Sequence, residues 1–102
     1  RHFRLDKNTK LIVGRNKDEN EMIMALALPN DILLEAKDHV GPTTLLRGDN
    51  LDSHIEFSAK ITLRYSDAPK NQQGIITIHK NADIIEISVN HAEEISYTKF
   101  RI

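Results

Sequence analysis

The stretch IVGRNKDEN, residues 12–20, constrains the fold more than any other part of the chain. Its apolar run ends at Gly14, and we expect a helix to begin at Asn16. Asparagine is a favoured N-cap residue, and Glu19, three residues on, completes a capping box. The stretch therefore predicts a strand, a tight turn and the N-terminus of a helix.

The predicted junction has the features of an anion-binding site. The first turn of a helix carries backbone N–H groups without partners, and the helix dipole places positive potential there. Two basic residues, Arg15 and Lys17, lie beside it. An ordinary helix that follows a strand has the same features, so the junction alone leaves both interpretations open.

Short runs of alternating apolar and polar residues predict a sheet built from strand pairs. The runs are residues 2–14, which predict a β-hairpin, residues 32–36 and 43–47, residues 75–79 and 84–89, and a last strand between Ile95 and Ile102. Helical spacing of apolar residues predicts two helices. The first is expected from Lys17 to Leu28 and the second from a capping box at Ser53 and Glu56 to about Ser66. The first helix should pack on the sheet through one apolar side.

The order of these elements predicts an α+β fold with a mostly antiparallel sheet and two helices. A chain of 102 residues, 39% hydrophobic and 28% charged, suits one small domain. The absence of cysteine excludes a thiol nucleophile, a cysteine-ligated zinc site and a disulfide framework. No apolar run predicts a membrane span or a signal peptide. Because the chain opens on Arg1, we expect a domain excised from a longer protein.

The charge balance limits how this chain could bind nucleic acid. Fourteen Lys and Arg against 15 Asp and Glu give a net charge of −1, so bulk electrostatics would not hold RNA. Any RNA binding needs a local patch. Four basic residues at strand ends or loops are candidates, although ordinary surface charges would look the same; they are Arg15, Lys17, Lys37 and Arg47.

Signals of catalysis are poor. No two of the five histidines have the i, i+4 spacing of a helical metal site, so no metal site is predicted. His39 beside Asp38 has no nucleophile to activate, and a solvated loop histidine is the simpler interpretation. No phosphate loop of the Walker type occurs. We therefore expect no catalytic residue and no cofactor in this chain.

Four ordered segments resemble the NFACT RNA-binding domain over nearly the whole chain. They are VGRNKDEN at 13–20, DILLEAKD at 31–38, GPTTLLRG at 41–48 and SAKITLRYS at 58–66. The resemblance implies a non-catalytic RNA-binding domain. It also assigns motif positions, namely Gly14, Arg15, Asn16, Asn20, Asp31, Lys37, Asp38, Gly41, Tyr65 and Ser66.

The residues of two segments indicate which version of the family the chain resembles. Leu33 and Glu35 stand where the ribosome-quality-control branch usually has Trp-x-His, and Pro42 and Thr43 stand in place of its Ser-His. The segment GPTTLLRG is instead similar to the version at the C-terminus of bacterial thiouridylase-like proteins with a PP-loop ATPase domain. That version implies a role in tRNA thiolation in the cytoplasm, with an upstream catalytic domain of the same chain as a partner and ATP bound there.

Two alternatives stay open beside tRNA binding. One is an RNA-binding domain of a ribosome-quality-control protein. The other is a protein-interaction or dimerisation module, since a late strand with Ile84, Ile85 and Ile87 would suit strand addition.

The junction at 14–16 and the loop at 37–41 are expected to frame one site for a phosphate or a splayed nucleotide. The proposed RNA-binding residues are Gly14, Arg15, Asn16, Lys17, Lys37 and Arg47. Structural roles are expected for Asn20, Asp38, Gly41, Tyr65 and Ser66. Asn20 should hydrogen-bond the neighbouring loop, and Asp38 should orient Lys37.

Overall fold

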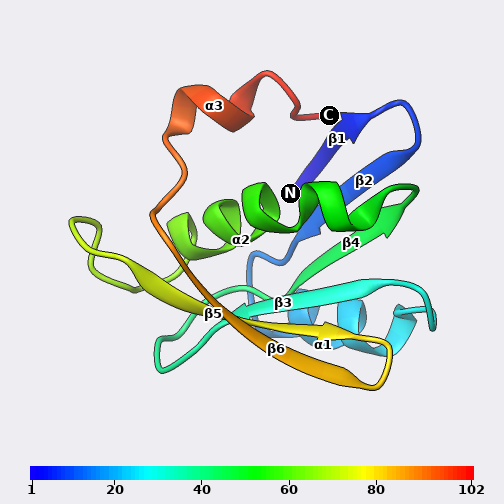
Figure 1. Ribbon diagram of the computed structural model, residues 1–102, viewed down its shortest axis with the longest axis horizontal. Helices are drawn as coiled ribbons and strands as arrows, with labels where there is room; N and C mark the ends of the chain where they lie inside the picture. The colour runs from blue at the N-terminus through cyan, green and yellow to red at the C-terminus, as the bar shows by residue number, and fades with distance from the viewer.

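The computed structural model describes residues 1–102 and contains one six-stranded sheet in which all neighbouring strands are antiparallel (Figure 1). The strands are β1 (His2–Asp6), β2 (Thr9–Val13), β3 (Ile32–Ala36), β4 (Thr44–Gly48), β5 (Gly74–Lys80) and β6 (Asp83–Val89). Their order across the sheet is β1-β2-β4-β3-β5-β6. The predicted hairpin and the two further strand pairs are therefore confirmed.

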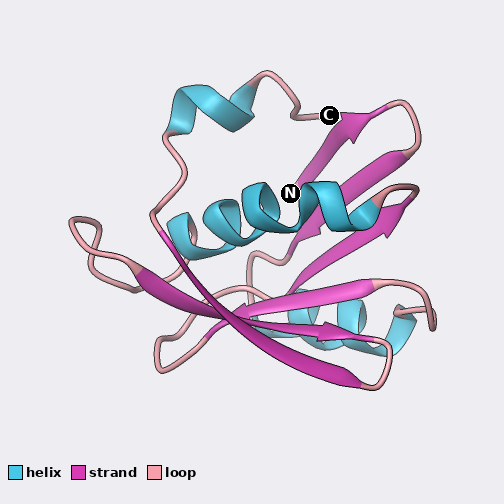
Figure 2. Ribbon diagram, in the orientation of Figure 1, coloured by secondary structure: helices cyan, strands magenta, loops and turns pink.

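Two sizeable helices, α1 (Lys17–Leu26) and α2 (Ile55–Arg64), accompany the sheet, and a short helix, α3 (Glu94–Thr98), precedes the C-terminus (Figure 2). A 3-10 turn, η1 (Leu51–His54), leads into α2. None of the helices has the length and apolar character that crossing a membrane requires. The predicted α+β class is confirmed.

The helices α1 and α2 lie on opposite faces of the sheet, as the alternation along β4 shows. The Thr44 hydroxyl bonds to the Thr62 hydroxyl of α2 at 2.9 Å. The next residue, Leu45, faces the other way and lines a groove together with Ile23 of α1. We call the face that bears α1 the outer face.

The core lies between the sheet and α2. Alternate residues of β1, β2, β3 and β5 point into it, and cross-strand partners such as Leu11 and Leu46 are fully buried. The largest fully buried apolar side chains are Phe3, Leu11, Ile32, Leu34, Leu46, Ile61, Leu63, Ile76 and Ile78. The core side of the sheet therefore packs against α2, while Ile23 is the one buried residue of α1.

The expected last strand between Ile95 and Ile102 is wrong. Residues 94–98 form α3, and only a single bridge between Arg101 and Phe3 follows it. Tyr97 is buried edge-on against Phe3, with ring centroids 5.8 Å apart, whereas Ile95 is 80% exposed. The apolar alternation here therefore does not mark one face of a strand. The segment still covers the β1 edge, because the Arg4 N–H donates to the Phe100 carbonyl at 2.8 Å.

Three expected details of the helices are also wrong. The Ser53 hydroxyl does not cap α2 but donates to the Asn50 carbonyl at 2.7 Å within η1, so the capping box with Glu56 is not formed. Helix α1 ends at Leu26 rather than at Leu28. Its apolar side is not packed as expected either, since Met22 is 61% exposed and Leu26 64% exposed.

Candidate functional site

The junction between β2 and α1 is built as the capping pattern predicts. The Asn16 side chain accepts the Glu19 N–H at 2.9 Å. The Glu19 carboxylate in turn accepts the Arg15 N–H at 3.1 Å, and the Gly14 N–H donates to the Thr43 carbonyl at 3.0 Å. These N–H groups thus have acceptors within the protein. The expectation that the N–H groups of Gly14 and Arg15 stand open for an anion is therefore corrected.

Close packing explains why the junction carries a glycine. A Cβ atom on Gly14 would lie 2.0 Å from the Oδ1 atom of Asn20. That Oδ1 atom accepts the N–H of Thr43 at 2.9 Å and so joins α1 to the loop before β4. Asn20 thus hydrogen-bonds the neighbouring loop, in a structural contact.

The loop before β4 is also held by the end of α2. A Cβ atom on Gly41 would lie 2.7 Å from the Cβ atom of Ser66, and the Asp67 N–H donates to the Val40 carbonyl at 2.8 Å. The Ser66 hydroxyl donates to the Leu63 carbonyl at 2.6 Å. Gly41 and Ser66 therefore meet directly and set the position of this loop.

A hollow of about 410 Å³, which we call the junction pocket, lies between these segments. Its lining comprises Arg1, Gly14, Arg15, Asn16, Lys17, Asn20, Val40, Gly41, Pro42, Tyr65 and Asp67. The structure thus brings together the two predicted segments. The Lys17 side chain is largely exposed, and its Nζ atom lies 4.0 Å from Glu21.

Lys37 does not line the junction pocket. Its Nζ atom lies 2.9 Å from a carboxylate oxygen of Glu86 on β6, and this contact raises the pKa of the Lys37 amine. Asp38 makes no hydrogen bond to Lys37 and instead has a left-handed backbone with φ of 65°. The expected single site formed by Arg15 and Lys37, with Asp38 orienting the lysine, is therefore corrected.

Arg47 forms an ion pair with Asp31 next to the C-terminal end of α1. Its Nε and Nη2 atoms donate to the Asp31 carboxylate at 3.0 and 2.6 Å, and Nη2 also donates to the Leu26 carbonyl at 3.3 Å. The same carboxylate accepts the Leu28 N–H at 2.7 Å. Burial would raise the pKa of Asp31, but the hydrogen bonds from Arg47 and Leu28 outweigh it and hold that pKa below its ordinary value.

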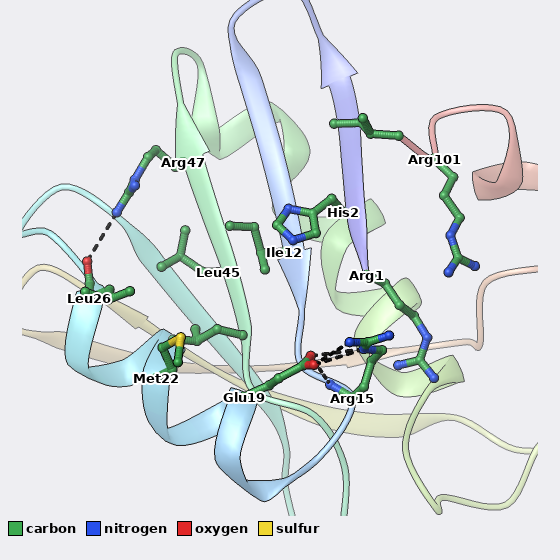
Figure 3. A pocket seen from close by; sticks show the side chains of 12 residues that line it. Arg1, His2, Ile12, Arg15, Glu19, Met22, Leu26, Leu45, Arg47 and Arg101 are labelled. Carbon is green, nitrogen blue, oxygen red and sulfur yellow. Dashed lines mark hydrogen bonds and ion pairs between the residues drawn. The ribbon is translucent and has the colours of Figure 1, made fainter.

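A larger groove of about 640 Å³, which we call the α1 groove, lies between α1 and the outer face of the sheet (Figure 3). Its apolar residues are Ile12, Met22, Ile23, Leu26, Leu45 and Ile102, and its polar and charged residues are Arg1, His2, Arg15, Glu19, Arg47 and Arg101. Four arginines and one glutamate therefore line an apolar floor. The groove is a candidate for the local basic patch that RNA binding would need at this net charge.

Sequence reasoning missed Arg1, His2 and Arg101 as members of this groove. They come from the two ends of the chain, which meet because the Ile102 N–H donates to the His2 carbonyl at 2.9 Å. The basic character of the first ten residues is the only signal in the sequence for Arg1 and His2, and Arg101 has none. Burial lowers the pKa of His2, and the positive charges of Lys10 and Arg15 act in the same direction, which favours the neutral form of this imidazole.

Tyr65 holds one of the arginines in place. The Arg1 guanidinium carbon lies 4.0 Å from the centroid of the Tyr65 ring, a cation–π arrangement. Tyr65 packs in turn against Tyr97, with ring centroids 5.7 Å apart. The motif tyrosine therefore positions Arg1 where the junction pocket meets the α1 groove.

Arg15 and Glu19, which both line the α1 groove, form an ion pair. The guanidinium donates to the carboxylate from Nη2 at 2.7 Å and from Nε at 3.0 Å. We expect Glu19 to titrate with a pKa of about 2, because the Arg15 side chain and the Arg15 N–H both bond to the charged carboxylate. A lowered pKa in the folded state means that this stabilisation is present above the ordinary carboxyl pKa and is lost as the pH falls toward 2.

An NMR titration of the Glu19 side-chain carboxyl would measure this pKa. In Arg15→Ala the same carboxyl should titrate close to its ordinary value. If Glu19 titrated there in the wild type as well, the pair would not be formed in solution.

A family model described as the NFACT protein RNA binding domain matches residues 1–101. The chain belongs to this family. The family resemblance stated from the ordered segments is thereby confirmed, and with it the assignment of the chain to an RNA-binding domain family.

The fold of this NFACT RNA-binding domain has been seen before. It is similar to the C-terminal part of the fibronectin/fibrinogen-binding protein from Streptococcus suis, with a TM-score of 0.83 and 17% sequence identity. The match covers 99% of this chain and 48% of the other, so the chain spans about half of that structure. At this identity the likeness concerns the fold alone. None of the curated proteins matches the sequence.

Proposed function

We propose that this NFACT RNA-binding domain is a non-catalytic accessory domain that holds tRNA for a tRNA-thiolating PP-loop ATPase of the cytoplasm. The observation that carries the proposal is the gathering of four arginines around the α1 groove in a domain whose net charge is only −1. The ATP-binding catalytic domain would lie upstream in the same chain. The segment GPTTLLRG supports a thiouridylase-like parent protein, because its sequence is similar to that version of the family.

RNA would contact the domain where the junction pocket and the α1 groove meet. Both hollows are lined by Arg1 and Arg15, and Lys17 extends the positive surface past Asn16. Arginine suits phosphate because its planar fork makes paired hydrogen bonds. Of the other proposed contacts, Arg47 reaches RNA only while it also holds Asp31, and Lys37 stands apart beside Glu86.

A small patch implies few phosphate contacts and therefore a shallow salt dependence. If about three phosphates are neutralised, the slope of log K against log salt should be on the order of −2 to −3. A titration of the domain with tRNA at low and moderate salt measures both the affinity and this slope. Absence of binding at low salt would defeat the proposal.

Three single variants would locate the tRNA surface. Arg15→Ala should weaken tRNA binding by about 1–2 kcal/mol, the range for a charge-assisted bond in a partly solvated site. Lys37→Ala should weaken it less, since Lys37 is outside both hollows. The control is Lys60→Ala on α2, whose partner is Glu56 at 3.8 Å. If Lys60→Ala weakened binding as much as Arg15→Ala, the exposed side of α2 that bears Lys60 and Glu56 would be the better site.

A second candidate is a protein-interaction or dimerisation module. The observation in its favour is that the C-terminal segment covers the β1 edge, whereas β6 ends the sheet with Ile84 and Ile85 exposed. Such an edge suits strand addition. Sedimentation of the same samples discriminates, because a stable dimer without tRNA binding would favour this candidate.

A further inference from the structure

The floor of the α1 groove is more apolar than phosphate binding needs. The largely exposed Met22 and Leu26 of α1 line the groove together with Ile12 and Leu45 of the sheet (Figure 3). A phosphate gains no binding energy from aliphatic surface, whereas the face of a nucleobase can pack against it favourably. The groove has no phenylalanine, tyrosine or tryptophan in its lining, so a base would lie on aliphatic side chains and guanidinium planes.

The size of the groove and the placement of its charges suit one nucleotide. Its volume of about 640 Å³ lies within the range of roughly 300–1,000 Å³ that is usual for small-ligand sites. Arg1 and Arg15 lie at one end, Arg47 at the other, and Arg101 at the side (Figure 3). A base on the floor would therefore have positive charge on either side for the adjoining phosphates.

Glu19 occupies the edge of the Arg15 guanidinium that a phosphate would use. Its carboxylate accepts the Nη2 and Nε hydrogens, which is the paired geometry that arginine also offers to phosphate. Both side chains are partly exposed, at 62% and 31%, so solvent weakens the contribution of the pair to stability. The lowered pKa of Glu19 shows that its charged carboxylate still favours this position, so an RNA phosphate must compete with it for the Arg15 guanidinium.

We propose that the α1 groove binds a single unpaired nucleotide of RNA, with its base on the apolar floor and its phosphate on Arg15 in place of Glu19. This inference rests on the proposed RNA-binding function and specifies the part of the RNA that is bound. Single-stranded RNA can place a base in a groove, whereas the bases of an A-form duplex are stacked and paired. The domain therefore selects unpaired RNA and not duplex.

The first test removes the charge that competes with phosphate. Glu19→Gln should bind a labelled oligouridylate of about twelve nucleotides roughly three- to tenfold more tightly than the wild type, because the Arg15 fork is released. The control is Glu56→Gln, which makes the same change in another exposed ion pair, with Lys60 on α2. It should change the affinity by less than about twofold, because distant exposed charges are screened.

The second test removes part of the apolar floor. Met22→Ala should weaken binding of the oligouridylate about three- to tenfold, in keeping with the loss of stacking surface for one base. The matched control is Met24→Ala on the same helix. Met24 is 58% exposed, nearly as much as Met22, but it does not line the groove. Neither methionine variant should alter the affinity for a duplex of oligouridylate with oligoadenylate.

The outcomes separate this inference from the function on which it rests. Tighter binding by Glu19→Gln than by Glu56→Gln, weaker binding by Met22→Ala than by Met24→Ala, and preference for the single strand would support the nucleotide site. If the wild type bound tRNA but held the duplex as tightly as the single strand, or if each variant matched its control, the nucleotide site would be wrong while RNA binding stood. A wild type that bound no RNA, with Glu19→Gln equally inactive, would overturn both.

Discussion

Gly48→Ala should lower the free energy of unfolding by about 2–4 kcal/mol, since it adds both backbone strain and a clash between backbones. Gly48 has φ of 137°, a conformation that residues with a side chain rarely adopt. A Cβ atom there would lie 1.9 Å from the Asn8 carbonyl oxygen and 2.7 Å from the Cα atom of Thr9. Both are backbone atoms, so relief requires opening the pairing of Thr9 with Gly48.

Urea unfolding of Gly48→Ala and wild type would measure this loss. The control is Asp49→Ala at the next position, because the Asp49 side chain is exposed and the bond from the Thr9 hydroxyl goes to the Asp49 backbone carbonyl. Exposed positions of this kind usually change stability by about 0.5 kcal/mol or less. Equal stability of the two variants would show that the turn adapts, and the strain argument would fail.

Asp31→Ala should cost about 2–3 kcal/mol of stability, because it leaves the partly buried N–H group of Leu28 and the Arg47 guanidinium without their acceptor. The Asp31 side chain is 4% exposed and accepts from both Arg47 and Leu28. Arg47 is 43% exposed and can regain water, which places the cost below that of breaking a fully buried pair. The last turn of α1 and the Arg47 end of the α1 groove should loosen together.

A double-mutant cycle on Asp31 and Arg47 would test this structural bond. Arg47→Ala added to Asp31→Ala should cost less than the sum of the two single changes, since one interaction is lost in both. Because the pKa of Asp31 is lowered, its contribution is present at neutral pH and fades as the pH falls below the ordinary carboxyl range. Arg15→Ala, in an exposed pair, is the control and should hardly affect folding. Additive costs at Asp31 and Arg47 would show that the pair is not coupled.

These expected results distinguish two kinds of arginine in the candidate RNA surface. Arg15 has an exchangeable partner on the surface, so its removal should change RNA affinity rather than folding. Arg47 has a buried partner, so its removal should change folding first. A loss of RNA binding in Arg47→Ala would therefore need a measurement of stability beside it before it could indicate a contact.

Local patterns in the sequence were enough to predict the elements nearest to the site. Alternation predicted the strands that flank α1, and the spacing of Asn16 and Glu19 predicted where α1 begins, because capping and strand periodicity depend on neighbours a few residues away. The ordered segments also indicated the family. Tertiary contacts explain why the segments carry these residues, since Gly41 packs directly against Ser66 and Asp31 pairs with Arg47.

Tertiary structure alone decided which charges share a surface. Lys37 was expected beside Arg15 but pairs with Glu86, and Arg101 joins Arg15 only because the C-terminal segment covers β1. The alternation near Ile95 resembled a strand, yet burial of Tyr97 against Phe3 favours a turn of helix. Periodicity determines the secondary structure of a segment, because it depends on neighbouring residues. Ion pairs and grooves depend on which distant segments pack together, and the packing of the whole core determines that.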